Sequence, residues 1–202
     1  MIEIKKLKKL YGDRTVLDFP ELIIKKGECV ILTGHNGSGK TTLMKILAGT
    51  LGQTEGEVKK EGSVYYLPQQ SLPFNMSVRK NILYCLEGSR KSKNETAEKL
   101  LDVLKLKQLE SKSAKTLSGG ECQRLSLARV LTKKADILLL DEPTSAADAE
   151  SRRLINEVIA EYYRKTGCTL VMITHTEEFP PIGNIRVIKL CDGKITQDKE
   201  EK

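Results

Sequence analysis

Short apolar runs alternate with longer amphipathic segments along this chain. Six runs have the length and composition of strands. They span residues 2–7, 28–33, 63–67, 137–141, 169–174 and 185–190. Apolar residues at helical spacing predict four helices. These cover residues 41–51, 95–107, 120–131 and 149–163.

This alternation of strands and helices predicts an α/β fold with a mostly parallel sheet. Residues 72–115 differ from the rest, because helical spacing dominates there, and we interpret them as a helical insert. The pair Asp192-Gly193 is a tight-turn signal and predicts a final hairpin.

Composition and charge narrow the class of protein. The chain has 202 residues, of which 39% are hydrophobic and 30% charged, as is typical of a globular protein. Its longest apolar runs are far shorter than the roughly 20 residues that cross a bilayer. The N-terminus does not resemble a signal peptide, so we predict a cytoplasmic protein that needs a membrane-embedded partner to work at a membrane.

The net charge is +7. We favour the interpretation that the excess Lys and Arg side chains are simply solvated on the surface; the second interpretation is that they attract the protein to a membrane surface. No nucleic-acid-binding motif appears, so no nucleic acid is expected as a partner. The five scattered cysteines predict free thiols.

Residues 34–41 read GHNGSGKT and fit the phosphate-binding loop pattern G-x-x-x-x-G-K-[ST]. A predicted strand precedes the loop and a predicted helix follows it, which is the context that such a loop needs. Its glycines let backbone N–H groups surround phosphates, and Lys40 places a positive charge near the terminal phosphates. Thr41 offers a hard oxygen to Mg²⁺, whereas His35 is expected to project outward. The nucleotide contacts expected from this loop are Gly34, Asn36, Gly37, Ser38, Gly39, Lys40, Thr41 and Thr42.

Three more segments accompany the loop: LSGGECQR at 117–124, ILLLDEPTSAAD at 137–148 and ITH at 173–175. Together they make the chain resemble the nucleotide-binding subunit of ABC transporters, from about residue 2 to about residue 195. The resemblance implies a P-loop NTPase core with a mostly parallel sheet, a small N-terminal antiparallel β-lobe and a helical subdomain insert. The implied cofactors are ATP and Mg²⁺.

The resemblance further implies one ABC ATPase domain over residues 1–202. Residues 1–70 and 117–202 then form the core with its β-lobe, and residues 71–116 form the helical insert. The stretch between Lys40 and Gln69 is short for the family, so a reduced β-lobe is expected.

The resemblance assigns roles to individual residues. Glu142 matches the general base that polarises the attacking water, and His175 matches the γ-phosphate contact. Gln69 matches the glutamine that touches Mg²⁺ and the water, with Gln70 as the alternative if the alignment shifts by one residue. An aromatic side chain at Tyr11 would stack on adenine. The implied metal ligands are Thr41, Gln69 and Asp141.

The segment at 117–124 carries the family's signature. Ser118 can cap the helix that follows, and a helix N-terminus favours phosphate. In the family this segment contacts the γ-phosphate held by a second subunit, so two ATP molecules lie between two head-to-tail chains. The contacts implied are Ser118, Gly119, Gly120 and Glu121. Residues 145–148 match the loop that crosses this interface.

Two positions depart from the family's pattern. Glu121 stands where Gln is usual and places a negative charge near the ribose side of the site, and Ala147 replaces the usual Leu. Neither substitution removes a catalytic group.

These observations predict a Mg²⁺-dependent ATPase subunit that powers a membrane ABC transporter, peripheral on the inner face of the cell membrane. The expected partners are an integral membrane permease, a second ATP-binding subunit in a homodimer or heterodimer, and possibly a substrate-binding protein. Residues 70–83 and the predicted helix 95–107 are expected to contact the permease. The alternatives are an ABC-type ATPase outside transport and a non-hydrolysing ATP-binding scaffold. Import, export and a cargo-free regulatory role are all open. The resemblance favours import, because compact stand-alone subunits of this kind are frequent in bacterial and archaeal importers, and the cargo is not encoded in this subunit.

Overall fold

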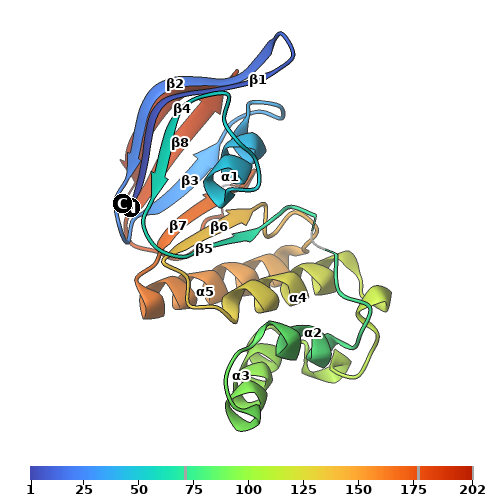
Figure 1. The fold of residues 1–202 in the computed structure, drawn as a ribbon. Helices are drawn as coiled ribbons and strands as arrows, with labels where there is room; N and C mark the ends of the chain where they lie inside the picture. Colours follow the sequence, from blue (N-terminus) through green and yellow to red (C-terminus); the bar gives the residue numbers. More distant parts are fainter. Residues whose placement is uncertain (71, 177, 202) are drawn as a thin grey trace.

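The structure, a computed structural model, describes residues 1–70, 72–176 and 178–201. Two sheets form its upper part (Figure 1). The larger has the strand order β5-β6-β7-β3-β8-β9. Strands β5 to β8 pair in parallel and β9 pairs antiparallel with β8. Their bounds are β3 Cys29–Thr33, β5 Val64–Leu67, β6 Ile137–Asp141, β7 Thr169–Ile173, β8 Ile185–Cys191 and β9 Lys194–Glu201.

The smaller sheet is antiparallel, with the order β2-β1-β4. It comprises β1 (Ile2–Tyr11), β2 (Arg14–Ile24) and β4 (Glu55–Lys60). The α/β class and the small antiparallel lobe are confirmed. The predicted hairpin is present between β8 and β9, where Asp192 and Gly193 both have positive φ, 47° and 77°.

Two apolar cores lie on opposite faces of the larger sheet, because successive side chains of a strand point to opposite sides. Ile137 and Leu139 of β6 join the core under the smaller sheet, together with helix α1 (Lys40–Ala48). Leu138 and Leu140 join the other core, against α4 (Gly119–Leu131) and α5 (Ala149–Thr166). Burial on both faces explains why β6 has an uninterrupted apolar run rather than an alternating one.

Glycines with positive φ end two helices. Gly49, with φ 76°, ends α1 and stops it short of the predicted residue 51. Gly167, with φ 63°, ends α5, which runs three residues beyond the predicted end at residue 163. A left-handed residue after the last turn is where glycine is favoured.

The chain between β5 and α4 is helical and extends below α4 in Figure 1. It holds α2 (Val78–Cys85), α3 (Arg90–Val103) and two short 3₁₀ turns, η1 (Lys107–Leu109) and η2 (Ala114–Thr116). The predicted helix over 95–107 is wrong in its bounds. Ser89 caps α3 by accepting from the Ser92 N–H, so the helix begins earlier, and Lys105 has φ 52°, so it cannot continue. Among the described residues, no helix is both long and apolar enough to span a membrane.

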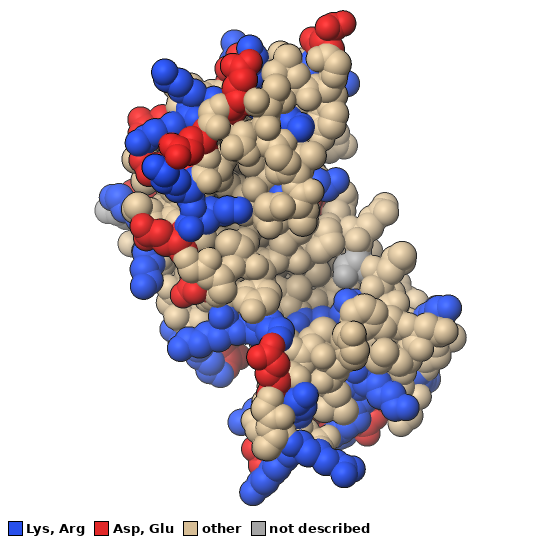
Figure 2. All heavy atoms as spheres, in the orientation of Figure 1, with Lys and Arg blue, Asp and Glu red and all other residues tan. Residues whose placement is uncertain are grey.

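Charged side chains of both signs are interspersed over the face seen in Figure 2, and the Lys and Arg groups do not merge into one patch there. This face fits the interpretation of the excess positive charge as solvated surface.

Asn81 fixes the segment that leads from β5 into α2. Its side chain is fully buried, and its Nδ2 lies 3.0–3.2 Å from the carbonyl oxygens of Phe74, Met76 and Ser77. Its Oδ1 accepts from the Phe74 N–H at 2.8 Å. One polar side chain thereby hydrogen-bonds to the backbone of residues 74–77, the irregular segment between β5 and α2.

We expect Asn81→Ala to destabilise the protein by at least about 2 kcal/mol, because it leaves the Phe74 N–H without its partner and a cavity in place of a fully buried side chain. The free energy of unfolding from urea titration would measure this. Asn75→Ala, at an exposed position of the same segment, is the matched control and should change stability little. Equal stability of the two variants would contradict this role for Asn81.

Candidate active site

The phosphate-binding loop joins the end of β3 to the start of α1, as predicted. It lies close to β8: a Cβ added at Gly34, which has φ 139°, would fall 2.1 Å from the Leu190 carbonyl oxygen. Only glycine fits this approach. The loop therefore has a fixed path past the end of the sheet.

Lys40 points back into the loop in this structure. Its Nζ donates to the carbonyl oxygens of Gly34 at 2.8 Å and His35 at 3.0 Å. Burial lowers the pKa of the Lys40 ammonium, and the negative charges of Glu142 and Asp141 partly oppose that effect. The positive charge of Lys40, together with the backbone N–H groups of the loop, suits a polyphosphate ligand.

The hollow over the loop is lined by the loop itself and by β1 and β2. Tyr11 ends β1 with 53% of its surface exposed. It lines the hollow together with Arg14, Asn36, Gly37, Thr41 and Thr42. An exposed ring beside phosphate-binding amides is available to stack on a base. Gln69, Glu142 and His175 line the same hollow.

Asp141 lies at the carboxyl end of β6 and faces the loop. Its Oδ1 accepts from the Thr41 hydroxyl at 3.4 Å, and its Oδ2 accepts from the Tyr66 hydroxyl at 3.1 Å. Burial raises the pKa of the Asp141 carboxyl, while the hydrogen bonds from Tyr66 and Thr41 lower it. Tyr66 was not predicted as a site residue. The sequence could have indicated it only through its tyrosine hydroxyl on β5, the strand beside β6, which ends in Asp141.

Glu142 follows Asp141 in a strained conformation. Its φ is 52°, in the left-handed region that is costly for a residue with a side chain. Its N–H donates to the Ile173 carbonyl of β7 at 3.1 Å. The turn aims the Glu142 carboxylate into the hollow while Asp141 faces the loop.

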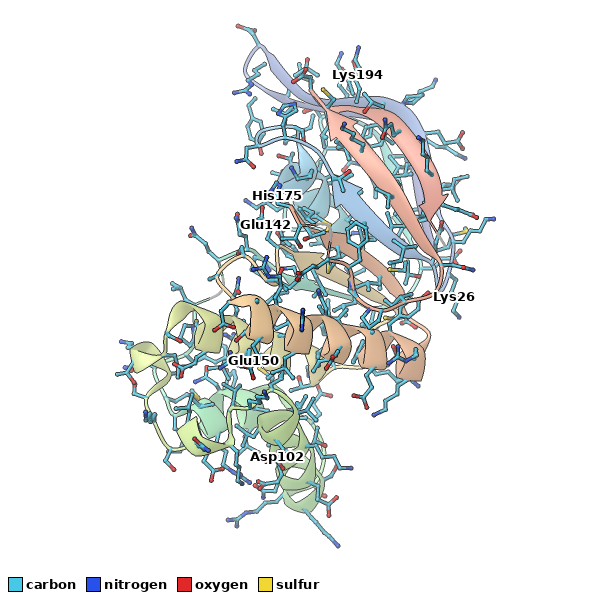
Figure 3. The ribbon with its side chains drawn as sticks, turned by 180° about the vertical axis from the view of Figure 1, so that it is seen from behind. Lys26, Asp102, Glu142, Glu150, His175 and Lys194 are labelled. Atoms are coloured by element: carbon cyan, nitrogen blue, oxygen red, sulfur yellow. The ribbon has the colours of Figure 1, made fainter. Side chains whose placement is uncertain are left out.

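The Glu142 carboxylate is held from two sides. Its Oε2 accepts from Gln69 Nε2 at 2.8 Å, and its Oε1 lies 2.9 Å from His175 Nε2. Figure 3 shows Glu142 and His175 side by side at the end of the sheet. Of the two glutamines considered, Gln69 is the one that makes this hydrogen bond, a contact that was not predicted. The three residues follow β5, β6 and β7, which are neighbours in the sheet.

The signature segment begins α4. Ser118 caps this helix by accepting from the Glu121 N–H, and the Glu121 carboxylate accepts from the Ser118 N–H at 2.8 Å. This second bond is the largest cause of the lowered pKa of Glu121. Glu121 therefore has a local role in the capping box, in addition to the charge expected from the sequence.

The signature residues are not brought to the phosphate-binding loop of their own chain. Ser118, Gly119, Gly120 and Glu121 line a separate hollow with Arg124 and Asp148. No residue of that hollow lines the one over the loop. A third hollow lies between them, lined by Gly119 together with Gln69, Asp141 and Glu142 but by none of residues 34–42. The structure thus places the signature residues beside Glu142 and away from the phosphate-binding loop.

Gln123 joins the signature segment to the surroundings of Glu142 and was not predicted. Its Nε2 donates to the Ser145 hydroxyl at 2.9 Å, and its Oε1 accepts from the Ala146 N–H at 3.1 Å. It thereby fastens the start of α4 to the loop that follows Glu142. Nothing in its spacing from other motifs signals this tertiary contact.

Comparisons with known proteins agree with this geometry. The family model described as ABC transporter matches residues 17–145. The tungstate uptake system ATP-binding protein TupC of Peptoclostridium acidaminophilum is 37% identical over 205 residues, which cover 96% of this chain and 92% of that protein. The aliphatic sulfonates import ATP-binding protein SsuB 1 of Streptomyces avermitilis is 36% identical over 98% of this chain and 76% of its own length.

A solved structure is also similar along the whole chain. It is the dimeric, post-hydrolysis state of the ATP-binding cassette MJ0796 bound to ADP and Pi. The TM-score is 0.88 with 26% identity, covering 100% of this chain and 99% of the other. The chain therefore belongs to the ABC transporter family, as one of its ATP-binding, ATP-hydrolysing subunits.

Proposed function

We propose that Glu142 is the general base of ATP hydrolysis in this subunit. The observation that carries the proposal is the contact of its carboxylate with both Gln69 and His175. A carboxylate fixed from two sides, at the mouth of a phosphate-binding loop, is oriented to accept a proton from water. Gln69 and His175 then position Glu142. We also assign His175, which lines the hollow over the loop, as a donor to the terminal phosphate.

A Mg²⁺ ion fits the residues present. The Thr41 hydroxyl and the Asp141 carboxylate face each other at 3.4 Å, and Gln69 adds an amide oxygen nearby. All three are hard oxygen donors of the kind Mg²⁺ prefers. When bound, the ion would neutralise charge on the phosphate oxygens. Asp141 must be ionised to attract it.

We infer that two chains assemble head to tail. The signature hollow is separate from the phosphate-binding hollow, and the N-terminus of α4 is a site that favours anions. In a head-to-tail pair, the signature of each chain faces the phosphates that are bound by the loop of the other chain. The similar cassette MJ0796 is described as dimeric, which supports this assembly.

We propose that the partners of the dimer are an integral membrane permease and, for import, a substrate-binding protein. The relatives are named for uptake of tungstate and import of aliphatic sulfonates, which supports import. The subunit then works at the inner face of the cell membrane, and we assign the choice of cargo to the membrane partner. The second ATP-binding subunit is a copy of this chain or a homologue.

We further propose a single ABC ATPase domain with residues 71–116 as its helical insert. Apolar residues of α2 and α3, such as Ile82 and Leu101, belong to the same core as Leu138 of the sheet, which supports one domain. The proposed boundary at residue 71 and the last residue, 202, lie outside the described residues.

The permease surface is proposed on Leu72, Phe74 and Tyr84. Leu72 and Tyr84 are 85% and 70% exposed. The rings of Phe74 and Tyr84 meet edge to face at 5.0 Å, and the Arg129 guanidinium lies 4.1 Å from the centre of the Phe74 ring. Ile82, expected on this surface, is fully buried instead. Met76 is half-buried.

Glu142→Gln should bind ATP but hydrolyse it at least about 10²-fold more slowly, because the amide cannot accept a proton. Phosphate release would measure turnover, and a fluorescent ATP analogue would measure binding. Lys40→Ala is the contrasting variant and should lose ATP affinity. Near-normal turnover in Glu142→Gln would place the base elsewhere.

With saturating Mg-ATP, Glu142→Gln should double its molar mass in light scattering, because bound ATP is not consumed. Adding Ser118→Arg should abolish that dimer while ATP still binds to the intact phosphate-binding loop. If Ser118→Arg abolished ATP binding by the monomer as well, the signature would act on its own chain, contrary to the head-to-tail arrangement.

Tyr66→Phe should move the acid limb of the ATPase pH profile to higher pH. The Tyr66 hydroxyl is a bond that lowers the pKa of Asp141, so its loss raises that pKa further and protonates Asp141 at a higher pH. The ATPase rate measured across pH tests this. Tyr65→Phe, at the neighbouring position of β5 whose side chain packs in the opposite core, should leave the limb in place.

Leu72→Glu or Tyr84→Glu should reduce co-purification with the permease from membranes, since a carboxylate cannot be buried in an apolar contact without a partner. ATP binding by the isolated subunit should persist. Ile23→Glu, at another exposed apolar side chain on β2, is the control. Unchanged co-purification in both variants would place the permease contact elsewhere.

A further inference from the structure

The turn between β8 and β9 lies against the phosphate-binding loop. The Gly193 N–H donates to the Ser38 carbonyl at 3.1 Å, and Gly34 approaches the Leu190 carbonyl too closely for any side chain. Lys194, labelled in Figure 3, begins β9 directly after this turn. The two segments are thus adjacent although more than 150 positions separate them in the sequence.

Three side chains with metal-binding atoms meet over this contact. His35 comes from the loop, and Cys191 and Asp192 come from the turn. One ligand atom from each lies within 4.8 Å of the others. His35 Nε2 is 3.3 Å from Asp192 Oδ1, and Cys191 Sγ is 3.7 Å from Asp192 Oδ2. No second group of this kind occurs in the part of the chain that the structure describes.

The imidazole of His35 is oriented for metal binding. Its Nδ1 lies 2.8 Å from the Asn36 carbonyl oxygen, and because a carbonyl only accepts, Nδ1 carries the proton. In the neutral ring the lone pair is then on Nε2, which faces Asp192. A hydrogen bond from one ring nitrogen to a backbone carbonyl is the usual support of a histidine that binds a metal through the other. Two acceptors facing each other at 3.3 Å need a proton or a cation between them.

Small side-chain movements bring the three ligands to the spacings of tetrahedral coordination. Zinc–nitrogen and zinc–oxygen bonds of about 2.0–2.1 Å and zinc–sulfur bonds of about 2.3 Å place neighbouring ligand atoms about 3.3–3.6 Å apart. The distances of 3.3 Å and 3.7 Å are close to these edges, but they end on different oxygens of Asp192. The Asp192 carboxylate therefore binds the ion through both oxygens, or rotates to present one, while His35 and Cys191 offer ligand atoms within 4.8 Å of each other. Nitrogen, sulfur and oxygen donors together favour Zn²⁺ over Mg²⁺, which prefers oxygen alone. Half or more of the His35 and Asp192 side chains is exposed, so solvent reaches the site and a water can complete it.

We propose that His35, Cys191 and Asp192 bind a thiophilic divalent cation, best matched by Zn²⁺, that clasps the phosphate-binding loop to the β8–β9 turn. Binding releases the Cys191 thiol proton to solvent, so affinity falls as pH is lowered. The ion joins side chains whose backbones are already in contact, and so restrains the first residues of the loop. This site is separate from the Mg²⁺ position, which is built from Thr41, Asp141 and Gln69.

Titration calorimetry of the full chain, kept reduced without a chelating thiol, tests the site with Zn²⁺ alone. One ion should bind per chain, and His35→Ala, Cys191→Ser and Asp192→Asn should each weaken binding by at least about tenfold. Cys85→Ser, which removes another half-buried thiol, should bind as the parent does. Excess Mg²⁺ should not displace Zn²⁺. Unchanged affinity in His35→Ala and Cys191→Ser would overturn the site.

Hydrogen exchange of the chain with and without Zn²⁺ tests the clasp, independently of ATP hydrolysis. Amides of residues 34–39 and 191–193 should exchange more slowly with the ion, and this protection should be absent in Cys191→Ser. His35 and Asp192 are exposed and Cys191 is half-buried, and an unchanged melting temperature without Zn²⁺ would confirm that each variant is folded. Binding of Zn²⁺ with no change in exchange at the loop would overturn the clasp.

Discussion

The arrangement of the active site depends on the parallel pairing of three strands. In this pairing β5, β6 and β7 run side by side, with Leu67 opposite Leu140 and Asp141 opposite Ile173. Because parallel strands end at the same edge, the residues that follow them meet there. A shift of β6 by one residue would turn Asp141 away from the loop and place a leucine in the site. Because β6 is apolar on both faces, the polar residues at its two ends distinguish this register: Asp136 accepts from the Ser63 N–H and Asp141 accepts from the Tyr66 hydroxyl.

The sequence predicts the parts of this site that depend on local chemistry. The loop, the strand ending at Asp141 and the helix cap at Ser118 are each signalled by residues adjacent to them. The convergence of Gln69, Glu142 and His175 follows once the strands are assumed to be parallel neighbours. Their mutual hydrogen bonds were not predicted, because strand order is a property of the folded sheet.

Other features were missed for identifiable reasons. Helix α2 was not predicted, since its buried residues Val78 and Ile82 alternate with charged and polar ones over little more than two turns. Asn81 appears as a polar residue in the sequence, although it is fully buried on backbone groups. Strand β2 mixes charged residues with Pro20 and forms as the edge of its sheet, where proline is tolerated.

Helix α4 has contacts of different kinds at its two ends. Gln123, in its first turns, holds the loop that follows Glu142, and Arg129, near its end, donates to the Leu72 carbonyl at 3.0 Å and covers the Phe74 ring. A helix of 13 residues is about 20 Å long and behaves as a stiff rod. Helix α4 therefore links the surroundings of Glu142 to the exposed side chain of Leu72 through one continuous element. A displacement imposed on one end of a stiff rod is felt at its other end, with no rearrangement of the helix itself.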